Sequence, residues 1–178
     1  MRKLSNAELN RKSVTDFRAA PKSPFIVVLD NVRSLNNVGS VFRTADAFIV
    51  EALWLCGITA TPPHREIHKT ALGATESVAW RYFKTAAEAV KELREKGYVI
   101  VSVEQAEGAV SLENYLPEAG KKYALVFGHE IKGVSEEVVN MSDVCIEIPQ
   151  YGTKHSFNVA VSAGIVLWEL TGRIACHK

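Results

Sequence analysis

The sequence predicts a single α/β domain built on a mainly parallel β-sheet with helices on both faces. Short apolar runs, which suit buried strands, alternate along the chain with segments of helical spacing. Strands that are apolar along their whole length belong to a sheet covered on both faces. The 178 residues are enough for one domain with a sizeable core. The expected strands are residues 25–29, 52–56, 98–103, 123–127 and 144–148.

Four helices are expected between and after these strands. Residues 37–48 repeat apolar side chains at helical spacing, and residues 85–96 form an amphipathic helix that ends at Gly97. A third helix is expected to begin near Ser135. The last helix, over residues 159–170, is apolar nearly all round, so it has more apolar surface than one sheet face can cover.

Charge is distributed unevenly along the chain. The formal net charge is only +1, but the first 22 residues are rich in basic side chains. We therefore divide the chain into a basic N-terminal extension, 1–24, and a single domain, 25–178. A basic arm on a near-neutral body can contact nucleic acid, and a solvated tail is the alternative. The basic residues of the arm are Arg2, Lys3, Arg11, Lys12, Arg18 and Lys22.

The cysteines and the hydropathy pattern indicate a cytoplasmic protein. Cys56, Cys145 and Cys176 are odd in number and far apart, which fits neither a disulfide framework nor a zinc site. Met1 is not followed by the apolar stretch of a signal peptide, and no run approaches the roughly 20 apolar residues of a membrane span. We expect no membrane segment and no metal.

Three polar loops follow strands of the predicted sheet. The first leads into the helix that carries Asn37, expected to cap that helix, and Arg43. The second spans residues 128–135, and the third spans residues 148–158, with Ser156 and Asn158 marking the start of the last helix. Because α/β folds bind ligands beyond the carboxyl ends of their strands, these loops are candidates for a binding site.

The second loop is not a nucleotide-triphosphate loop. Gly128 and Gly133 have the G-x-x-x-x-G spacing, but Val134 stands where such a loop needs lysine, and Lys132 is misplaced. The G-x-G-x-x-G dinucleotide fingerprint is also absent. The glycines indicate instead that backbone comes close to something flat or bulky.

Together the loops closely resemble the three motifs of the SpoU/TrmH class of RNA methyltransferases, in the SPOUT superfamily. The patterns are N-x-G-x-x-x-R from Asn37, L-V-F-G-x-E-x-x-G-V from Leu125, and I-P-x-x-G-x-x-x-S-x-N-V-x-V-x-x-G from Ile148. The resemblance covers residues 25–170. His129-Glu130-Ile131 departs from the more usual Ser-Glu-Gly or Ala-Glu-Gly, which affects local loop geometry but retains the glutamate.

The resemblance implies a SPOUT-type α/β knot, in which the C-terminal chain forms a trefoil, and a homodimer that uses the surplus apolar face of the last helix. A charge there, such as Val166→Asp, is expected to disrupt the dimer. It also implies transfer of a methyl group from S-adenosylmethionine to a ribose 2′-hydroxyl of RNA. The implied cofactor contacts are Val103, Glu104, Gln105, Phe127, Gly128, Ile148, Pro149, Ser156 and Phe157.

The resemblance implies catalytic roles for Arg43, Asn37, Glu130, Ser156 and Asn158. The family assigns activation of the hydroxyl to the arginine. A guanidinium loses its proton only above about pH 12 and is a poor base, so we expect Arg43 to hold an RNA phosphate and stabilise the alkoxide. No metal is needed, because a sulfonium methyl group is already activated.

The remaining catalytic residues are expected to act as supports. Asn37 would orient Arg43 or the ribose, and Glu130 would accept loop N–H groups or anchor Asn37. Ser156 and Asn158 would line the cofactor and substrate pocket. His129 and His155 are alternative bases, although a loop histidine is more often incidental.

Two other functions stay open. One is methylation of a base nitrogen, as carried out by other members of the superfamily; the combination of Asn37, Arg43 and the Ser156-x-Asn158 pair favours the ribose instead. The other is a catalytically idle RNA-binding dimer. The presence of all motif residues argues against that alternative. With about 24 residues before the first strand, the chain resembles compact family members, so we expect tRNA rather than rRNA as the substrate.

Overall fold

A parallel sheet forms the centre of the molecule in a computed structural model, which describes residues 1–5 and 7–176. Within those residues the sheet has seven strands in the order β3-β2-β1-β6-β4-β7-β5, and every neighbouring pair is parallel. The strands are β1 (Ser23–Asp30), β2 (Val50–Cys56), β3 (Trp80–Phe83), β4 (Tyr98–Val103), β5 (Val110–Ser111), β6 (Lys122–Phe127) and β7 (Val144–Glu147).

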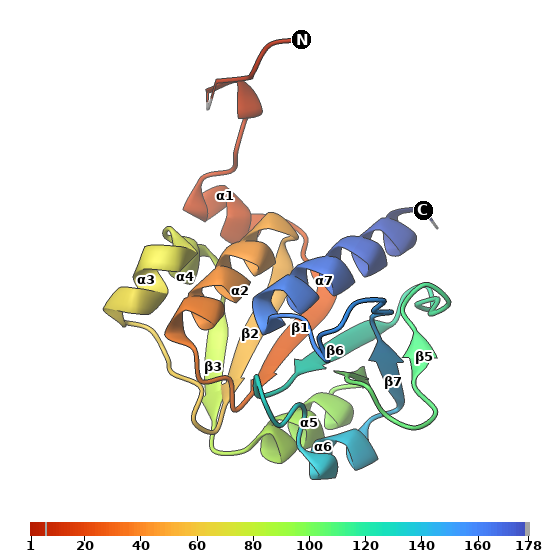
Figure 1. The fold of residues 1–178 in the computed structure, drawn as a ribbon. Coiled ribbons are helices and arrows are strands. Elements are labelled where there is room, and N and C mark those ends of the chain that lie inside the picture. Colours follow the sequence, from red (N-terminus) through yellow and green to blue (C-terminus); the bar gives the residue numbers. More distant parts are fainter. Residues whose placement is uncertain (6, 177–178) are drawn as a thin grey trace.

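Helices cover both faces of this sheet, as the sequence predicts. Helices α1, α2, α3, α4 and α7 contribute to the core on one face, and α5 and α6 to the core on the other (Figure 1). The helices are α1 (Val14–Ala19), α2 (Leu35–Ala47), α3 (Arg65–Ala71), α4 (Ala74–Ser77), α5 (Ala86–Glu95), α6 (Glu136–Met141) and α7 (Val159–Cys176), with a short 3-10 turn, η1, at Ala7–Leu9.

Strand β1 shows why both faces are apolar. Side chains alternate across a strand, so Phe25, Val27 and Leu29 enter the core under α2 and α7. Ile26 and Val28 enter the opposite core, under α5 and α6. An uninterrupted apolar run is what such a central strand requires.

The start of α2 differs from the prediction. The N-cap is Ser34, whose hydroxyl accepts a hydrogen bond of 3.3 Å from the Asn37 N–H. Asn37 therefore lies inside the first turn, and its expected capping role is wrong. At α7 the expected cap is present, because Asn158 Oδ1 accepts the Ala160 N–H at 2.9 Å.

The basic N-terminal segment has two parts. Residues 1–5 and 7–13 are exposed, and the chain toward Met1 extends away from the domain (Figure 1). Helix α1 is docked on the domain, because Phe17 is buried in the core and Arg18 Nε donates to the Glu76 carbonyl at 3.0 Å. A deletion of the whole segment would therefore remove a core side chain.

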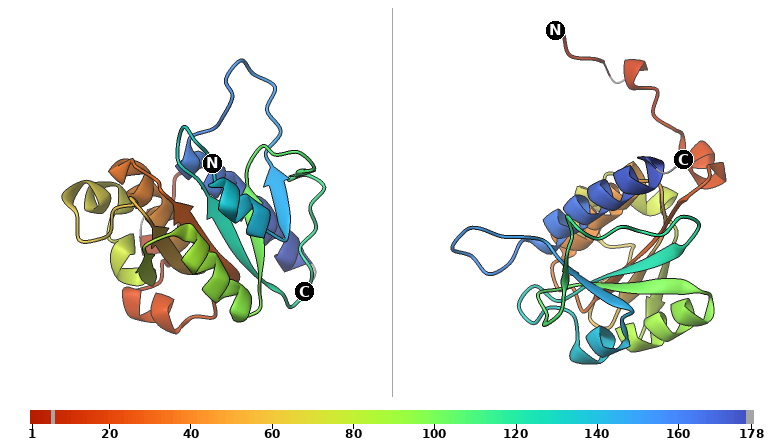
Figure 2. Two further views of the ribbon diagram at one scale, coloured as in Figure 1. Left: turned by 90° about the horizontal axis from the view of Figure 1, so that it is seen from below. Right: turned by 90° about the vertical axis from the view of Figure 1, so that its right-hand side faces the viewer.

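The chain returns to the sheet between two strands that it has already formed. Strand β7 pairs with β4 on one side and β5 on the other, while residues 104–109 connect β4 directly to β5. The loop after β7 stands out from the body of the domain (Figure 2). Helix α7 then lies beside α2 (Figure 1).

Helix α7 has a buried face and an exposed apolar face. Val166 and Leu167 are fully buried, whereas Val161 is 50% and Trp168 71% exposed. The choice of Val166→Asp as a probe of a dimer interface is therefore wrong, since this side chain faces the core of its own domain.

The described residues contain neither a membrane-spanning helix nor a cluster of metal-binding side chains. None of their helices is long and apolar enough to cross a membrane. Nor do three or more of their histidine, cysteine, aspartate and glutamate side chains gather where they could hold a metal ion.

Candidate active site

A cavity of about 270 Å³ lies between the ends of β4, β6 and β7 and the loops that follow them. It contains all of the expected cofactor contacts except Pro149, which lines a different groove. Of the expected catalytic residues, Glu130 and Ser156 line the cavity. The expected contacts found in its wall are Val103, Glu104, Gln105, Phe127, Gly128, Ile148, Ser156 and Phe157.

The Glu130 carboxylate joins the second loop to the start of α2. Its oxygens accept the backbone N–H groups of Arg33 at 3.1 Å and Ser34 at 2.9 Å. The same carboxylate accepts the Asn37 side-chain amide at 3.1 Å. Both contacts suggested for Glu130 by the sequence, with loop N–H groups and with Asn37, are therefore present.

These hydrogen bonds keep Glu130 ionised. Burial would by itself raise the pKa of this carboxyl group, since it penalises the charged form. The N–H groups of Arg33, Ser34 and Glu130 and the Asn37 amide outweigh burial and hold the pKa of Glu130 below its ordinary value. Glu130 is therefore a charged acceptor at neutral pH and not a proton donor.

Asn37 extends this link to the third loop. Asn158 Nδ2 donates to Asn37 Oδ1 at 3.0 Å, while Asn158 Oδ1 caps α7. Neither asparagine lines this cavity, and the role expected of Asn158 beside the substrate stays a prediction. The connected unit of Glu130, Asn37 and Asn158 joins the three loops, with Glu130 in the cavity wall and the two asparagines outside it.

The end of β4 makes a second set of links. Glu104 Oε2 accepts the Val134 N–H at 2.8 Å, and Oε1 accepts the Gln105 N–H at 2.9 Å. Gln105 Nε2 donates to the His155 carbonyl at 2.9 Å. Two consecutive side chains thus connect β4 to both the second and the third loop.

The glycines of the second loop allow it to fold back on itself. A Cβ at Gly128 would lie 2.0 Å from the carbonyl carbon of Gly133, and Gly133 has a φ of 69°. His129 and Gly133 exchange backbone hydrogen bonds of 3.0 and 2.8 Å. The close approach is therefore to the loop's own backbone at Gly128 and to the Glu104 carboxylate at Gly133.

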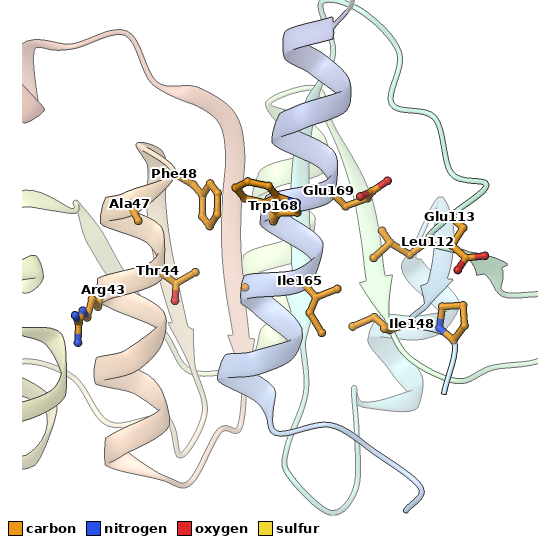
Figure 3. Close-up of a pocket in the computed structure, with 12 residues that line it drawn as sticks. Arg43, Thr44, Ala47, Phe48, Leu112, Glu113, Ile148, Ile165, Trp168 and Glu169 are labelled. Atoms are coloured by element: carbon orange, nitrogen blue, oxygen red, sulfur yellow. The ribbon is translucent and has the colours of Figure 1, made fainter. Parts of the chain in front are cut away.

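Arg43 lies outside this cavity. It is six residues beyond Asn37 on α2, a rotation of about 240° and a rise of about 9 Å, so the two side chains leave the helix on different sides. Figure 3 shows Arg43 directed away from α7. The expected contact from Asn37 to Arg43 is wrong, because the Asn37 side chain binds Glu130 and Asn158 instead.

A second groove, of about 730 Å³, runs between α2 and α7. Pro149 and Arg43 line it, together with Phe48 and the exposed Trp168, whose rings meet edge to face at 6.4 Å (Figure 3). This groove is mainly apolar, in contrast to the polar wall of the first cavity.

The histidines of the loops have structural contacts. His129 Nδ1 accepts the Ile131 N–H at 3.0 Å, so that atom is occupied within its own loop. The His155 carbonyl holds Gln105, and its side chain is exposed in the cavity wall. Sequence reasoning missed Ser162, which also lines the cavity; it lies one helical turn after Asn158, a spacing that could have found it.

The fold and the loops define a parallel α/β protein with a ligand cavity at the carboxyl ends of its strands. Residues 24–168 match the model of the SpoU rRNA Methylase family, and the chain belongs to this family. The solved TrmH/SpoU tRNA modifying enzyme of A. aeolicus superposes with a TM-score of 0.80 at 27% identity, over 92% of this chain and 83% of that one.

The names of other relatives describe methylation of ribosomal or transfer RNA. The 23S rRNA (guanosine-2′-O-)-methyltransferase RlmB of Neisseria meningitidis is 32% identical over 82% of this chain and 57% of its own. The tRNA (guanosine(18)-2′-O)-methyltransferase of Thermus thermophilus is 29% identical over 91% of this chain and 81% of its own.

One solved relative was crystallised with the cofactor. The AdoMet-bound rRNA methyltransferase of Sinorhizobium meliloti has a TM-score of 0.77 at 27% identity, over 86% of this chain and 58% of that one. The chain spans only 57–64% of the length of the RlmB relatives that it matches.

Proposed function

We propose that this protein transfers a methyl group from S-adenosylmethionine to a ribose 2′-hydroxyl of RNA. The observation that carries the proposal is the connected unit of Glu130, Asn37 and Asn158, which joins all three family motifs around one cavity. The guanosine-2′-O activity named for the rRNA and tRNA relatives supports the ribose over a base nitrogen.

The residues of the cavity fit S-adenosylmethionine. Val103, Phe127 and Ile148 supply apolar wall for an adenine ring, while Glu147 and Lys132 offer charges to the two ends of an amino acid. When bound, this cofactor supplies a methyl group on a sulfonium, which a weak oxygen nucleophile can attack. Glu130 and Glu104 hold the loops in place, so the cavity is shaped before binding.

The role of Arg43 requires a second copy of the chain. Arg43 does not line its own cavity, but it is among the residues that line the apolar groove, on the side of α2 away from Trp168. The Trp168 side chain is large and apolar and is 71% exposed beside this groove, which suits a homodimer interface. We propose that docking there brings Arg43 of one protomer to the cavity of its partner, where it holds an RNA phosphate and stabilises the developing alkoxide.

We also propose that the C-terminal part of the chain is knotted. Strand β7 enters between β4 and β5, which residues 104–109 already connect, and the chain then crosses to α7. Such an insertion is the arrangement that a threaded chain needs. The thiols of Cys56 and Cys145 are free, which fits a reducing compartment, so we propose a cytoplasmic location.

The experiment is to map ribose methylation in RNA from cells with and without this gene. A nucleotide that loses its 2′-O-methyl group identifies the substrate, with tRNA expected before rRNA. The purified protein and S-adenosylmethionine should then restore the mark on RNA from the deletion cells. If calorimetry finds no binding of S-adenosylmethionine, the chain is an idle RNA-binding scaffold and the proposal fails.

A further inference from the structure

A third groove, of about 520 Å³, lies beside α2 and shares no lining residue with the cofactor cavity. Its walls come from the N-terminal arm, from the C-terminal half of α2 and from the turn between α3 and α4. Arg43 lines this groove as well as the apolar one. Figure 3 shows its side chain directed away from α7, and Arg43 belongs to the lining of the third groove.

Basic side chains line this groove from two directions. Arg11 and Lys12 come from the arm, and Arg43 comes from α2; all three are exposed. Asp46 and Glu76 also line the groove, so its lining has a formal net charge of +1, and the Asp46 carboxylate accepts the Ser77 hydroxyl. The groove thus presents three cations, from segments far apart in sequence, to a ligand that enters it.

Apolar side chains lie beside these cations. Leu72 is 65% exposed and Val14 40% exposed, and both line the groove. Leu72 has a φ of 49°, a conformation that leucine seldom adopts, and its N–H is held by the His68 carbonyl at 3.1 Å. The turn therefore holds a large apolar side chain at the surface, where burial does not explain it.

We propose that this groove binds a single-stranded nucleotide next to the one that is methylated. The inference rests on the proposed function. Arg11, Lys12 and Arg43 would hold its phosphates, and Leu72 and Val14 would cover one face of its unstacked base. A mixture of fixed cations and exposed apolar surface suits a nucleotide, which has both a charged and a flat apolar part. Because Arg43 is proposed to reach the cavity of the partner protomer, this nucleotide would lie beside the ribose that reacts there.

The test compares two double variants of the same arm. Arg11→Ala with Lys12→Ala removes two cations from the groove, and Arg2→Ala with Lys3→Ala removes two cations that do not line it. Binding is measured with small RNA from cells that lack the gene, at several salt concentrations. The groove variant should bind RNA at least about tenfold more weakly. The slope of log K against log[salt] should become less steep by about 1.5, since two phosphate contacts are lost. The control should change less than about threefold.

A third variant tests the apolar part of the groove. Leu72→Asn removes the apolar side chain but keeps a residue that tolerates positive φ, so folding should be preserved. The loss of one base contact should weaken RNA binding about fivefold or more. The salt slope should stay unchanged, because no charge is removed.

The outcomes separate the groove from the proposed activity. The proposed role of the groove is refuted if RNA binding weakens equally in the Arg11 and Lys12 variant and in the Arg2 and Lys3 control. It is also refuted if Leu72→Asn binds RNA as tightly as wild type. If the wild type binds RNA with the expected sensitivity to Arg11 and Lys12 but transfers no methyl group, the groove stands and the proposed function fails. If methyl transfer occurs and neither variant changes RNA binding or KM, the function stands and the groove fails.

Discussion

The side-chain amide of Asn158 donates a hydrogen bond of 3.0 Å to Oδ1 of Asn37, across 121 residues of sequence. The Asn37 side-chain amide also donates to the Glu130 carboxylate, and Asn158 Oδ1 accepts an N–H group of the first turn of α7. The helix that carries Arg43 and the helix that follows the third loop are thus joined by a polar contact as well as by their packing in one core. Since each amide is both donor and acceptor, neither residue can be replaced by a carboxylate without losing a partner.

The substitution Asn37→Asp should strongly reduce methyl transfer while the domain stays folded. The new carboxylate would face Glu130, which is ionised, so repulsion would replace a hydrogen bond. We expect turnover to fall about a hundredfold, the scale of losing one charge-positioning group. The measurement is single-turnover methylation of substrate RNA, with circular dichroism to monitor folding.

The neighbouring substitution Asn36→Asp is the matched control. Asn36 is exposed and only its backbone carbonyl is engaged, with Ser40 and Thr70. It adds the same charge one residue away and should retain near wild-type turnover. A similar loss in both variants would mean that charge near α2, and not the link to Glu130, is responsible.

The pH dependence of stability should report the Glu130 carboxylate. Its pKa is lowered in the folded protein, so its contribution to stability is complete above the ordinary value of about 4.3. That contribution is lost as the pH falls through the folded pKa. The difference in free energy of unfolding between wild type and Glu130→Gln should therefore be constant from about pH 6 to 8 and narrow below about pH 4.

Urea unfolding at a series of pH values measures this difference. The exposed Glu136, in the first turn of α6, provides the control substitution Glu136→Gln. A gap between wild type and Glu130→Gln that widens on acidification would contradict the assignment of Glu130 as a stabilised anion.

Two single substitutions to aspartate on α7 should distinguish the residues needed for dimerisation from those needed for folding. We expect wild type to sediment as a dimer and Trp168→Asp to sediment as a folded monomer with little activity, because Trp168 is exposed beside the apolar groove. Val166→Asp should unfold the domain instead, at a cost of about 3 kcal/mol or more, because it buries an unpaired charge. A fully active wild-type monomer would refute the shared site.

Local pattern predicted much of the fold, and its failures have local reasons. The central strands are apolar runs and were found, but β3 and β5 lie at the sheet edges, are short and partly exposed, and give no such signal. The cap of α2 was misplaced because Ser34, Asn36 and Asn37 are all capable of capping and lie within four residues.

The active-site links could not be read from periodicity. Glu130, Asn37 and Asn158 meet only because β1, β6 and α7 bring distant loops together, and the family resemblance was what singled them out. The separation of Asn37 from Arg43 was accessible from the sequence, because six residues of helix turn by about 240°. What helical geometry cannot supply is the surface that Arg43 faces, which the N-terminal arm helps to form.

Arg43 is the residue whose loss should affect chemistry most specifically. Arg43→Ala should leave binding of S-adenosylmethionine nearly intact, since Arg43 is outside the cavity, and reduce turnover at least about a hundredfold. Arg43→Lys should be nearly as poor, because a point charge cannot reproduce a planar guanidinium on phosphate and alkoxide. If Arg43 were itself the base, its loss would remove a limb of the pH–rate curve; as an electrostatic support, it should lower the curve without changing its shape.

Mixed dimers can locate the cavity that Arg43 serves. An Arg43→Ala protomer keeps an intact cavity, and an Asn37→Asp protomer keeps an intact Arg43. If Arg43 acts across the dimer, one site of the mixed dimer has both, and activity should return when the two inactive variants are combined. If Arg43 acts within its own chain, both sites stay defective and the mixture stays inactive. Each variant alone, refolded under the same conditions, provides the baseline against which recovery is measured.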